Sequence, residues 1–206
     1  MRTSTSQAER PLSALDVIYG RRSVRSYGAQ PLEASTVRGL LDAAVQAPTA
    51  MLEQPWLFVV VQDRWLLKRI SDCAKQLLAS DPPPALGLAA DGANGHGDFA
   101  ARLAAPAFNI FYDAPALIVI CAKRTDDEFV RADCWLAAEN LMLAAEALGL
   151  GTCCVAAAVP ALNTAEVKSV LRIPADVHAV APIVVGVPAG TVAPASRRAP
   201  KVISWR

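Results

Sequence analysis

The sequence is poor in the side chains that bind metals or move protons. Its 206 residues include two histidines, His96 and His178, and five cysteines without a C-x-x-C pair. Neither histidine has a second histidine or a cysteine at ligand spacing, so we expect no metal site. An odd number of cysteines without that pattern indicates free thiols in a reducing compartment, and we therefore expect a cytoplasmic protein.

Charged and aromatic residues are also scarce. Charged residues make up 19% of the chain, and 20 Lys and Arg against 19 Asp and Glu leave a formal net charge of +1. A near-neutral chain does not fit a general nucleic-acid binder, which usually carries a basic stripe. The chain has 40 alanines but only 12 aromatic residues, and 53% of it is hydrophobic. This composition excludes disorder of the whole chain and predicts a single domain over residues 1–206, whose small apolar faces need a partner.

No long uninterrupted hydrophobic run is present. Residues 1–11 are polar and lack the apolar core of a signal peptide. The longest apolar stretch, 135–160, contains Glu139, Asn140 and Glu146, which would be costly in lipid. We expect no membrane association, and we interpret this stretch as a buried helix followed by a strand.

Helical and strand patterns alternate along the chain. Apolar residues at helical spacing, with caps such as Ser13 and Asp63, predict helices over 13–20, 33–47, 63–78, 98–108, 126–148 and 164–171. Short β-branched runs predict buried strands over 57–62, 116–122, 152–159 and 179–187. This alternation favours an α/β or α+β domain. Residues 81–97, with three prolines and four glycines, are expected to form a flexible loop within it, and 188–206 an extended tail.

Common catalytic motifs are absent. There is no P-loop and no G-x-S-x-G, and Gly149-Leu-Gly151 follows a helix and enters a strand, the reverse of a dinucleotide-binding turn. Cys121, Cys153 and Cys154 fall in predicted core strands, so packing is a better interpretation for them than nucleophilic catalysis. Any redox chemistry must therefore come from a cofactor.

Two cationic clusters could hold a phosphate group. The first is Arg21-Arg22-Ser23-Val24-Arg25, where an extended turn would project Arg21, Ser23 and Arg25 to one side. The second contains Arg197, Arg198 and Lys201. Taken alone, each cluster is more often a solvated charge run, whereas together they suggest that both ends of the chain meet at one phosphate.

The segment 47–58, with the sequence A-P-T-A-M-L-E-Q-P-W-L-F, is the most specific in the chain. It is either a helix–strand connector closed by a tryptophan or a turn of small residues against a flat ring. In the second case Gln54 would hydrogen-bond the polar edge of that ring.

These segments resemble the FMN-dependent nitroreductase family. The resemblance depends on five motifs in the family's order between residues 21 and 200: R-R-S-V-R, A-P-T-A-M-L-E-Q-P-W before F-V-V-V, A-P-A-L-I-V-I, L-M-L-A-A-E-A-L-G-L-G-T-C, and V-V-G-V-P before R-R-A-P. It implies an α+β fold, a three-layer α/β/α sandwich with a mostly antiparallel central sheet. It also implies an intertwined homodimer that binds one FMN per subunit at the interface, with residues 188–206 wrapping the partner subunit.

The resemblance also implies site residues. The FMN phosphate and ribityl chain would be held by Arg21, Arg22, Ser23, Arg25 and Arg198, with Arg197 as a neighbour worth testing. The segment lent to the flavin of the other subunit would present Pro48, Thr49, Ala50, Leu52 and Gln54, and the backbone of Ala156 and Ala157 would meet the ring. Two departures stand out: the family usually has Asn at the position of Leu52, and Gly-Gly or Glu-Gly at Ala156-Ala157.

The activity implied by the resemblance is NAD(P)H-driven, ping-pong reduction of nitroaromatics, quinones or related small oxidants. No side chain is expected to act as an obligatory acid or base, because FMN carries the chemistry. Phe108, Phe111 and Tyr112 are candidates for the substrate face, and packing beside the second strand is an equally good interpretation. The alternatives are another FMN-dependent reaction, such as dehalogenation or dehydrogenation, and a non-catalytic flavin-binding dimer.

Overall fold

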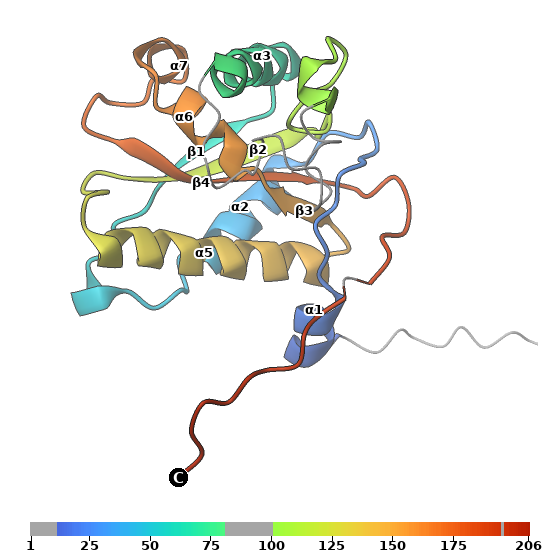
Figure 1. Cartoon of the computed structure of the whole chain (residues 1–206), viewed down its shortest axis with the longest axis vertical. Helices are drawn as coiled ribbons and strands as arrows, with labels where there is room; N and C mark the ends of the chain where they lie inside the picture. The colour runs from blue at the N-terminus through green and yellow to red at the C-terminus, as the bar shows by residue number, and fades with distance from the viewer. Residues whose placement is uncertain (1–11, 81–100, 195) are drawn as a thin grey trace, which may run out of the picture.

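The computed structural model describes residues 12–80, 101–194 and 196–206, and a four-stranded sheet lies at its centre (Figure 1). The strands are β1 (Leu57–Val61), β2 (Ala116–Ala122), β3 (Gly151–Cys154) and β4 (His178–Gly186). Their order is β1-β2-β4-β3, and all three pairings are antiparallel. The predicted strands over 116–122 and 179–187 are confirmed to within one residue at each end.

Two strand predictions are corrected by the structure. β1 is an edge strand with a single neighbour, so Leu57 and Val60 remain exposed and the strand is not fully buried as expected. The third strand ends at Cys154 rather than 159, because the chain turns into a short 3-10 helix (Ala156–Ala158) and then into α6 (Val159–Leu162). Pro160 lies in the first turn of α6, where a residue without an N–H is tolerated.

Helices cover both faces of the sheet, and Figure 1 shows the resulting three layers. On one side lie α3 (Arg64–Ser80), α6 and α7 (Ala165–Val170), and we call this the α3 side. On the other lie α1 (Ala14–Gly20), α2 (Ala34–Ala44) and α5 (Glu128–Ala147), which we call the α5 side. The α+β fold class and the three-layer α/β/α sandwich with an antiparallel sheet are thereby confirmed.

Several helix boundaries follow directly from the caps. Ser13 and Asp16 form a capping box at α1, and Asp63 accepts the backbone N–H of Leu66 at the start of α3. Thr164, rather than the preceding Asn163, caps α7. Asn163 instead donates to the carbonyls of Val159 and Ala179, at 3.0 Å each, because its amide has two donors to satisfy.

Other predicted boundaries were too wide. α2 ends at Ala44, and turns with i to i+3 hydrogen bonds follow it before Pro48. Of the predicted helix over 98–108, residues 101–104 are helical, and the chain leaves the helix before Pro106 because α conformation is disfavoured ahead of proline. The predicted loop over 81–97 and the first residues of that helix lie outside the described residues.

The core consists of two clusters separated by the sheet. Along β2, Leu117, Val119 and Cys121 face the α3 side, whereas Ala116, Ile118 and the other alternate residues face the α5 side. This alternation is the two-residue period of a strand, and both sets are fully buried. No helix among the described residues is long and apolar enough to cross a membrane.

The C-terminal tail leaves the sheet after β4. Tyr27 and Pro188 form an isolated antiparallel bridge, and the chain then passes α1 and extends away from the sheet (Figure 1). Ile203 and Trp205 near its end are almost fully exposed. The extended conformation of the tail agrees with its proline content, and its apolar side chains Val202, Ile203 and Trp205 are exposed.

Candidate functional site

The arginine turn, residues 21–25, runs along the sheet edge formed by β3. Ser23 forms an isolated parallel β-bridge with Thr152, and the backbone N–H of Val24 donates a hydrogen bond to the Thr152 carbonyl at 2.9 Å. Val24 is buried against Gly151, where an added Cβ would lie only 2.6 Å from the valine side chain. Gly151 therefore allows this close approach at the start of β3.

This extended pairing sets the direction of the side chains in the turn. Because Val24 points inward, Ser23 and Arg25 lie on the opposite, exposed side. The side chain of Arg21 lies against α5, where its Nε is 3.4 Å from Oε1 of Glu139. Three donors that suit an oxyanion are thus carried by one short segment.

Arg22 is used differently. Its guanidinium donates to the carbonyl oxygens of Tyr19, at 2.6 Å, and of Arg21, at 2.9 Å. These carbonyls belong to the end of α1, so Arg22 satisfies acceptors that a helix C-terminus leaves open. Its Nε is buried without a hydrogen-bond partner among the described residues, and its predicted role in cofactor binding stays a prediction.

The cysteines near the turn are not activated. Burial raises the pKa of the Cys153 thiol, although the charges of Arg25 and Arg21 act in the opposite direction. Burial also raises the pKa of Cys154 to about 11. Both thiols therefore stay protonated at neutral pH, and this supports packing over nucleophilic catalysis because the thiolate is the nucleophile. All five cysteines are free of disulfide bonds.

Ala156 and Ala157 follow β3 beside the turn. Ala156 is exposed and lines a pocket of about 440 Å³ together with Trp135, Arg131 and His178, whereas Ala157 is half-buried against the core of the α3 side. A flat ligand could therefore reach the backbone of this segment from the α5 side.

The predicted flavin-lending segment, 48–54, lies elsewhere. Its Ala50 N–H donates to the buried carboxylate of Asp133 on α5, at 3.2 Å to Oδ2 and 3.4 Å to Oδ1. Met51, Leu52 and Gln54 all have left-handed backbones, with φ of 52°, 58° and 47°. Non-glycine residues rarely adopt this conformation, so the segment stores backbone strain.

The side chains of this segment are presented outward. Pro48, Leu52 and Gln54 are exposed, while Thr49 and Ala50 are half-buried. Gln54 lines a pocket of about 290 Å³ that also contains Lys123 and Arg124.

The two predicted parts of the site meet α5 at different ends. The arginine turn begins next to Gly20, which lies against Glu146, whereas segment 48–54 is held by Asp133. These two helix residues are about 20 Å apart at 1.5 Å rise per residue, and Figure 1 shows the short cyan helix of segment 48–54 far from α1. One chain therefore does not bring the predicted site residues together.

Arg197 and Arg198 lie on the exposed tail. They make no hydrogen bond or ion pair with another residue of the part of the chain that is described. The predicted convergence of both chain ends on one phosphate is thus not formed within one described chain and stays a prediction.

The aromatic residues before β2 divide into two kinds. Phe111 has no exposed surface and belongs to the core, which is the packing alternative stated for it. Phe108 and Tyr112 are half-buried and form an edge-to-face pair with ring centroids 6.0 Å apart. Tyr112 also lies 5.9 Å from the guanidinium of Arg25, so these two rings border the arginine turn.

Sequence reasoning missed two residues at these places. Asp133 holds segment 48–54, and Arg102 stacks over Phe108 at 4.5 Å. Asp133 could have been noticed as an acidic residue within an otherwise apolar helix face. No pattern in the sequence indicates Arg102, because its contact with Phe108 forms where the chain leaves the helical residues 101–104.

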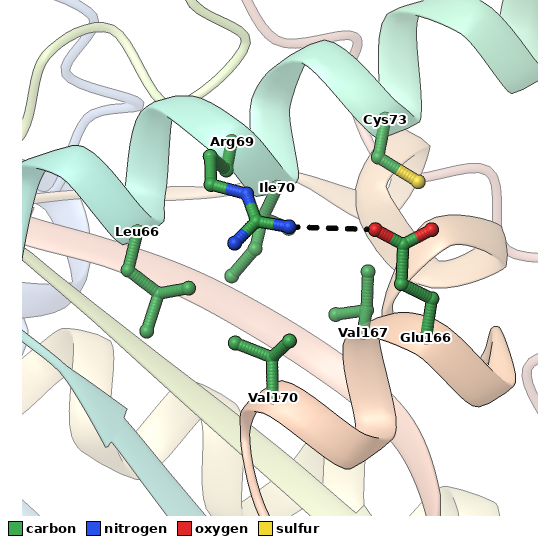
Figure 2. A pocket seen from close by; sticks show the side chains of 7 residues that line it. All are labelled: Leu66, Arg69, Ile70, Cys73, Glu166, Val167 and Val170. Carbon is green, nitrogen blue, oxygen red and sulfur yellow. Dashed lines mark hydrogen bonds and ion pairs between the residues drawn. The ribbon is translucent and has the colours of Figure 1, made fainter.

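A separate small pocket lies on the α3 side. Figure 2 shows Arg69 and Glu166 joined at 3.5 Å above Leu66, Ile70 and Val167, with Cys73 at one end. The space is about 20 Å³, enough for about one water molecule. It cannot hold a cofactor and is not part of the candidate site.

These features define an α+β sandwich protein with a cationic turn on a sheet edge and a strained loop beside its longest helix. Its sequence matches the profile of the Nitroreductase family over residues 18–187. The chain belongs to this family, which confirms the resemblance seen in its motifs.

Individual relatives agree with this assignment. A protein of Archaeoglobus fulgidus, provisionally named NADH dehydrogenase/NAD(P)H nitroreductase, is 33% identical over 67% of this chain. A protein of the same provisional name from Methanothermobacter thermautotrophicus is 28% identical over 68% of this chain. The matched regions span 64% and 59% of these relatives, less than two thirds of their length.

Solved structures show the same fold. A Bacteroides fragilis nitroreductase with bound FMN superposes with a TM-score of 0.77 at 21% identity, covering 95% of this chain and 100% of that one. A structure from Bacteroides thetaiotaomicron, titled with the same provisional name as the archaeal relatives, has a TM-score of 0.66 at 27% identity and covers 93% and 96% of the two chains.

Proposed function

We propose that this protein is an FMN-dependent oxidoreductase that uses NAD(P)H to reduce nitroaromatics, quinones or related small oxidants in a ping-pong reaction. When bound, FMN would supply the redox chemistry, accepting two electrons from the nicotinamide and passing them to the oxidant. The observation that carries the proposal is the arginine turn, a segment paired with β3 on which Ser23 and Arg25 are exposed and which begins with Arg21 beside Glu139.

The donors of this turn fit a phosphate group. Two guanidiniums and a hydroxyl can each donate to a phosphate oxygen, and charge-assisted hydrogen bonds are the strongest of their kind. Arg21 would exchange its ion pair with the half-exposed Glu139 for the phosphate, a small loss because exposed pairs contribute little. Arg197 and Arg198 would join the same phosphate from the tail.

The proposal requires a homodimer. Segment 48–54 is too far along α5 to face the arginine turn of its own chain, but a two-fold axis across α5 would bring it to the turn of the other chain. Large apolar side chains exposed in a single chain support this arrangement. They lie on α1, α5 and the tail: Leu15, Ile18, Tyr19, Phe129, Trp135, Leu136, Leu148, Val202, Ile203 and Trp205.

The protein's own part in catalysis would be binding and orientation. Gln54 and the backbone of Ala156 and Ala157 would position the ring, and the arginines would stabilise negative charge on the reduced cofactor. Among the described residues His178 is the one histidine, and it lines the pocket beside Ala156 without a carboxylate partner. No acid–base residue is required. The free thiols agree with the proposed cytoplasmic location.

A second candidate function is flavin binding without turnover, or with another reaction of the same cofactor. Leu52 favours it, because this exposed side chain stands where the resemblance leads us to expect a polar contact to the flavin. The loss of that contact would weaken FMN binding or change the preferred substrate.

Purified full-length protein separates these functions. We expect a yellow protein, or a colourless one that takes up FMN, whose flavin is bleached anaerobically by NADH or NADPH and reoxidised by a nitroaromatic or a quinone. Failure to bind added FMN would contradict both proposals. A yellow protein that neither nicotinamide bleaches would leave only the second.

A further inference from the structure

A cluster of two cations and two aromatic rings adjoins the arginine turn, and we call it the arginine–aromatic cluster: Arg25, Arg102, Phe108 and Tyr112. The rings of Phe108 and Tyr112 are inclined at 68°, with centroids 6.0 Å apart. The guanidinium carbon of Arg102 lies 4.5 Å from the Phe108 centroid and 6.0 Å from that of Tyr112, and that of Arg25 lies 5.9 Å from Tyr112. Two positive charges therefore flank one aromatic ring.

Neither cation of the cluster has an acidic partner in the described part of the chain. Arg21, Arg69 and Arg124 each face a glutamate, whereas Arg25 and Arg102 make no ion pair among the described residues. Arg102 is half-buried, as are Phe108 and Tyr112. The charge of Arg102 is thus only partly hydrated, and no carboxylate of the described residues compensates either cation, which favours an anionic ligand.

The way Arg102 is held makes it suitable for a planar anion. Stacking on Phe108 occupies the flat face of the guanidinium and leaves the N–H donors on its edge available. Those donors match the two oxygens of a carboxylate, and the stacked geometry is retained with little further loss of side-chain freedom. Tyr112, between the two cations, offers an aromatic surface next to them.

We propose that Arg102 is a specificity-determining residue that binds the carboxylate of an aromatic oxidant, with Phe108 and Tyr112 contacting the ring. This inference depends on the proposed function. Arg25 belongs both to the cluster and to the predicted phosphate site, so a ligand held by Arg102 lies beside the bound cofactor. The enzyme would therefore prefer carboxylated nitroaromatics over neutral ones of the same size.

The test compares 4-nitrobenzoate with the uncharged 4-nitrobenzyl alcohol, using FMN-loaded full-length protein. In Arg102→Ala we expect KM for 4-nitrobenzoate to rise about tenfold, the loss of one charge-assisted contact, while KM for the alcohol stays within about twofold and kcat is unchanged for both. Arg102→Lys keeps the positive charge but loses the paired N–H donors of the guanidinium, so its KM for 4-nitrobenzoate should lie between those of the unaltered protein and Arg102→Ala. Arg69→Ala is the matched control, because it removes an arginine of the α3 side that also stacks on an aromatic ring, that of Trp65.

Four results would overturn the inference: an equal rise in KM for both oxidants, weaker FMN binding in Arg102→Ala, a change confined to KM for NADPH, or the same effect in Arg69→Ala. Lack of turnover with either oxidant in the unaltered protein would instead contradict the proposed function. In that case calorimetric titration of the purified protein with 4-nitrobenzoate tests the role of Arg102 directly. Binding that is about tenfold weaker in Arg102→Ala supports the inference, and equal or undetectable binding in both proteins overturns it.

Discussion

The α3 side and the α5 side of the sheet differ in how much apolar surface one chain leaves uncovered. On the α3 side, charged residues such as Lys68, Arg69 and Asp72 face solvent in ion pairs while the apolar face of α3 packs on the sheet. On the α5 side, α5 is apolar around most of its circumference, and Phe129, Leu136 and other large side chains are exposed. Exposed apolar patches of this kind mark interaction surfaces, so they support the proposed dimer contact on the α5 side. On the α3 side Trp65 and Val170 are the large apolar side chains that are exposed among the described residues.

The largest expected difference between the two sides is in how a new charge on each of them affects dimer formation. Leu136 on α5 is 45% exposed and Val170 on α7 is 42% exposed. Leu136→Glu should weaken the dimer at least about 100-fold, because two-fold symmetry buries two uncompensated charges in one interface. Size-exclusion chromatography with light scattering should show a monomer that has lost FMN.

Val170→Glu is the control for that variant, and it should remain an FMN-loaded dimer. If Leu136→Glu is dimeric and yellow, α5 is not in the interface. If both variants become monomeric, the effect comes from destabilisation rather than from the α5 side.

The next largest expected difference is in FMN affinity, when an arginine is removed from the arginine turn or from the α3 side. Arg25→Ala removes a charge-assisted phosphate contact worth about 1.5–3 kcal/mol, so FMN should bind about 10- to 100-fold more weakly. Arg69→Ala on the α3 side removes an arginine that is already paired with Glu166, and FMN affinity should not change. Flavin fluorescence titration measures both. An unchanged affinity in Arg25→Ala would mean that the arginine turn is only solvated surface.

Aspartates test how segment 48–54 is held. Asp133→Ala leaves the Ala50 N–H without its acceptor, which should cost about 1–3 kcal/mol of unfolding free energy and release the strained backbone of the segment. Asp133→Asn keeps an acceptor oxygen and should recover most of the loss. Urea denaturation gives the stability, and FMN titration gives the effect on the site.

The control for this pair is Asp72→Ala, which removes an exposed partner of Lys68 on α3. It should cost less than about 1 kcal/mol, as exposed pairs do. Equal stabilities of Asp133→Ala and Asp72→Ala would contradict a specific role of Asp133.

The sequence predicted most of the fold because its local signals agree with one another. β2 and β4 are long β-branched runs between clear turn signals, and the cap residues Ser13 and Asp63 mark helix starts correctly. The errors lie where tertiary contacts decide. The exposure of β1 depends on its place at the edge of the sheet, and the early end of β3 depends on Val155, which bonds to Pro182 of β4 before the chain turns away.

The candidate site was predictable only in part. The alternation of Arg21, Ser23 and Arg25 follows from an extended backbone, and the structure places it on a sheet edge. The contact of Asp133 with Ala50 joins separate segments, so no spacing in the sequence reveals it. The contact of Arg102 with Phe108 depends on the chain leaving the helix after residue 104, which differs from the predicted helix over 98–108. Arg198 lies on the exposed tail, and its approach to the turn depends on the proposed dimer.

The smallest expected difference concerns left-handed residues on the two sides. Leu52 has φ 58° in segment 48–54, and Arg172 has φ 55° just after α7. Asn adopts this conformation more readily than Leu or Arg, so Leu52→Asn and Arg172→Asn should each raise the unfolding free energy by about 0.5–1 kcal/mol. Only Leu52→Asn should also strengthen FMN binding, by about two- to fivefold, because it adds one neutral hydrogen bond at the predicted flavin-facing position. If Arg172→Asn stabilises the protein while Leu52→Asn leaves FMN affinity unchanged, residue 52 does not face the flavin, and segment 48–54 contributes to the site through Gln54 alone.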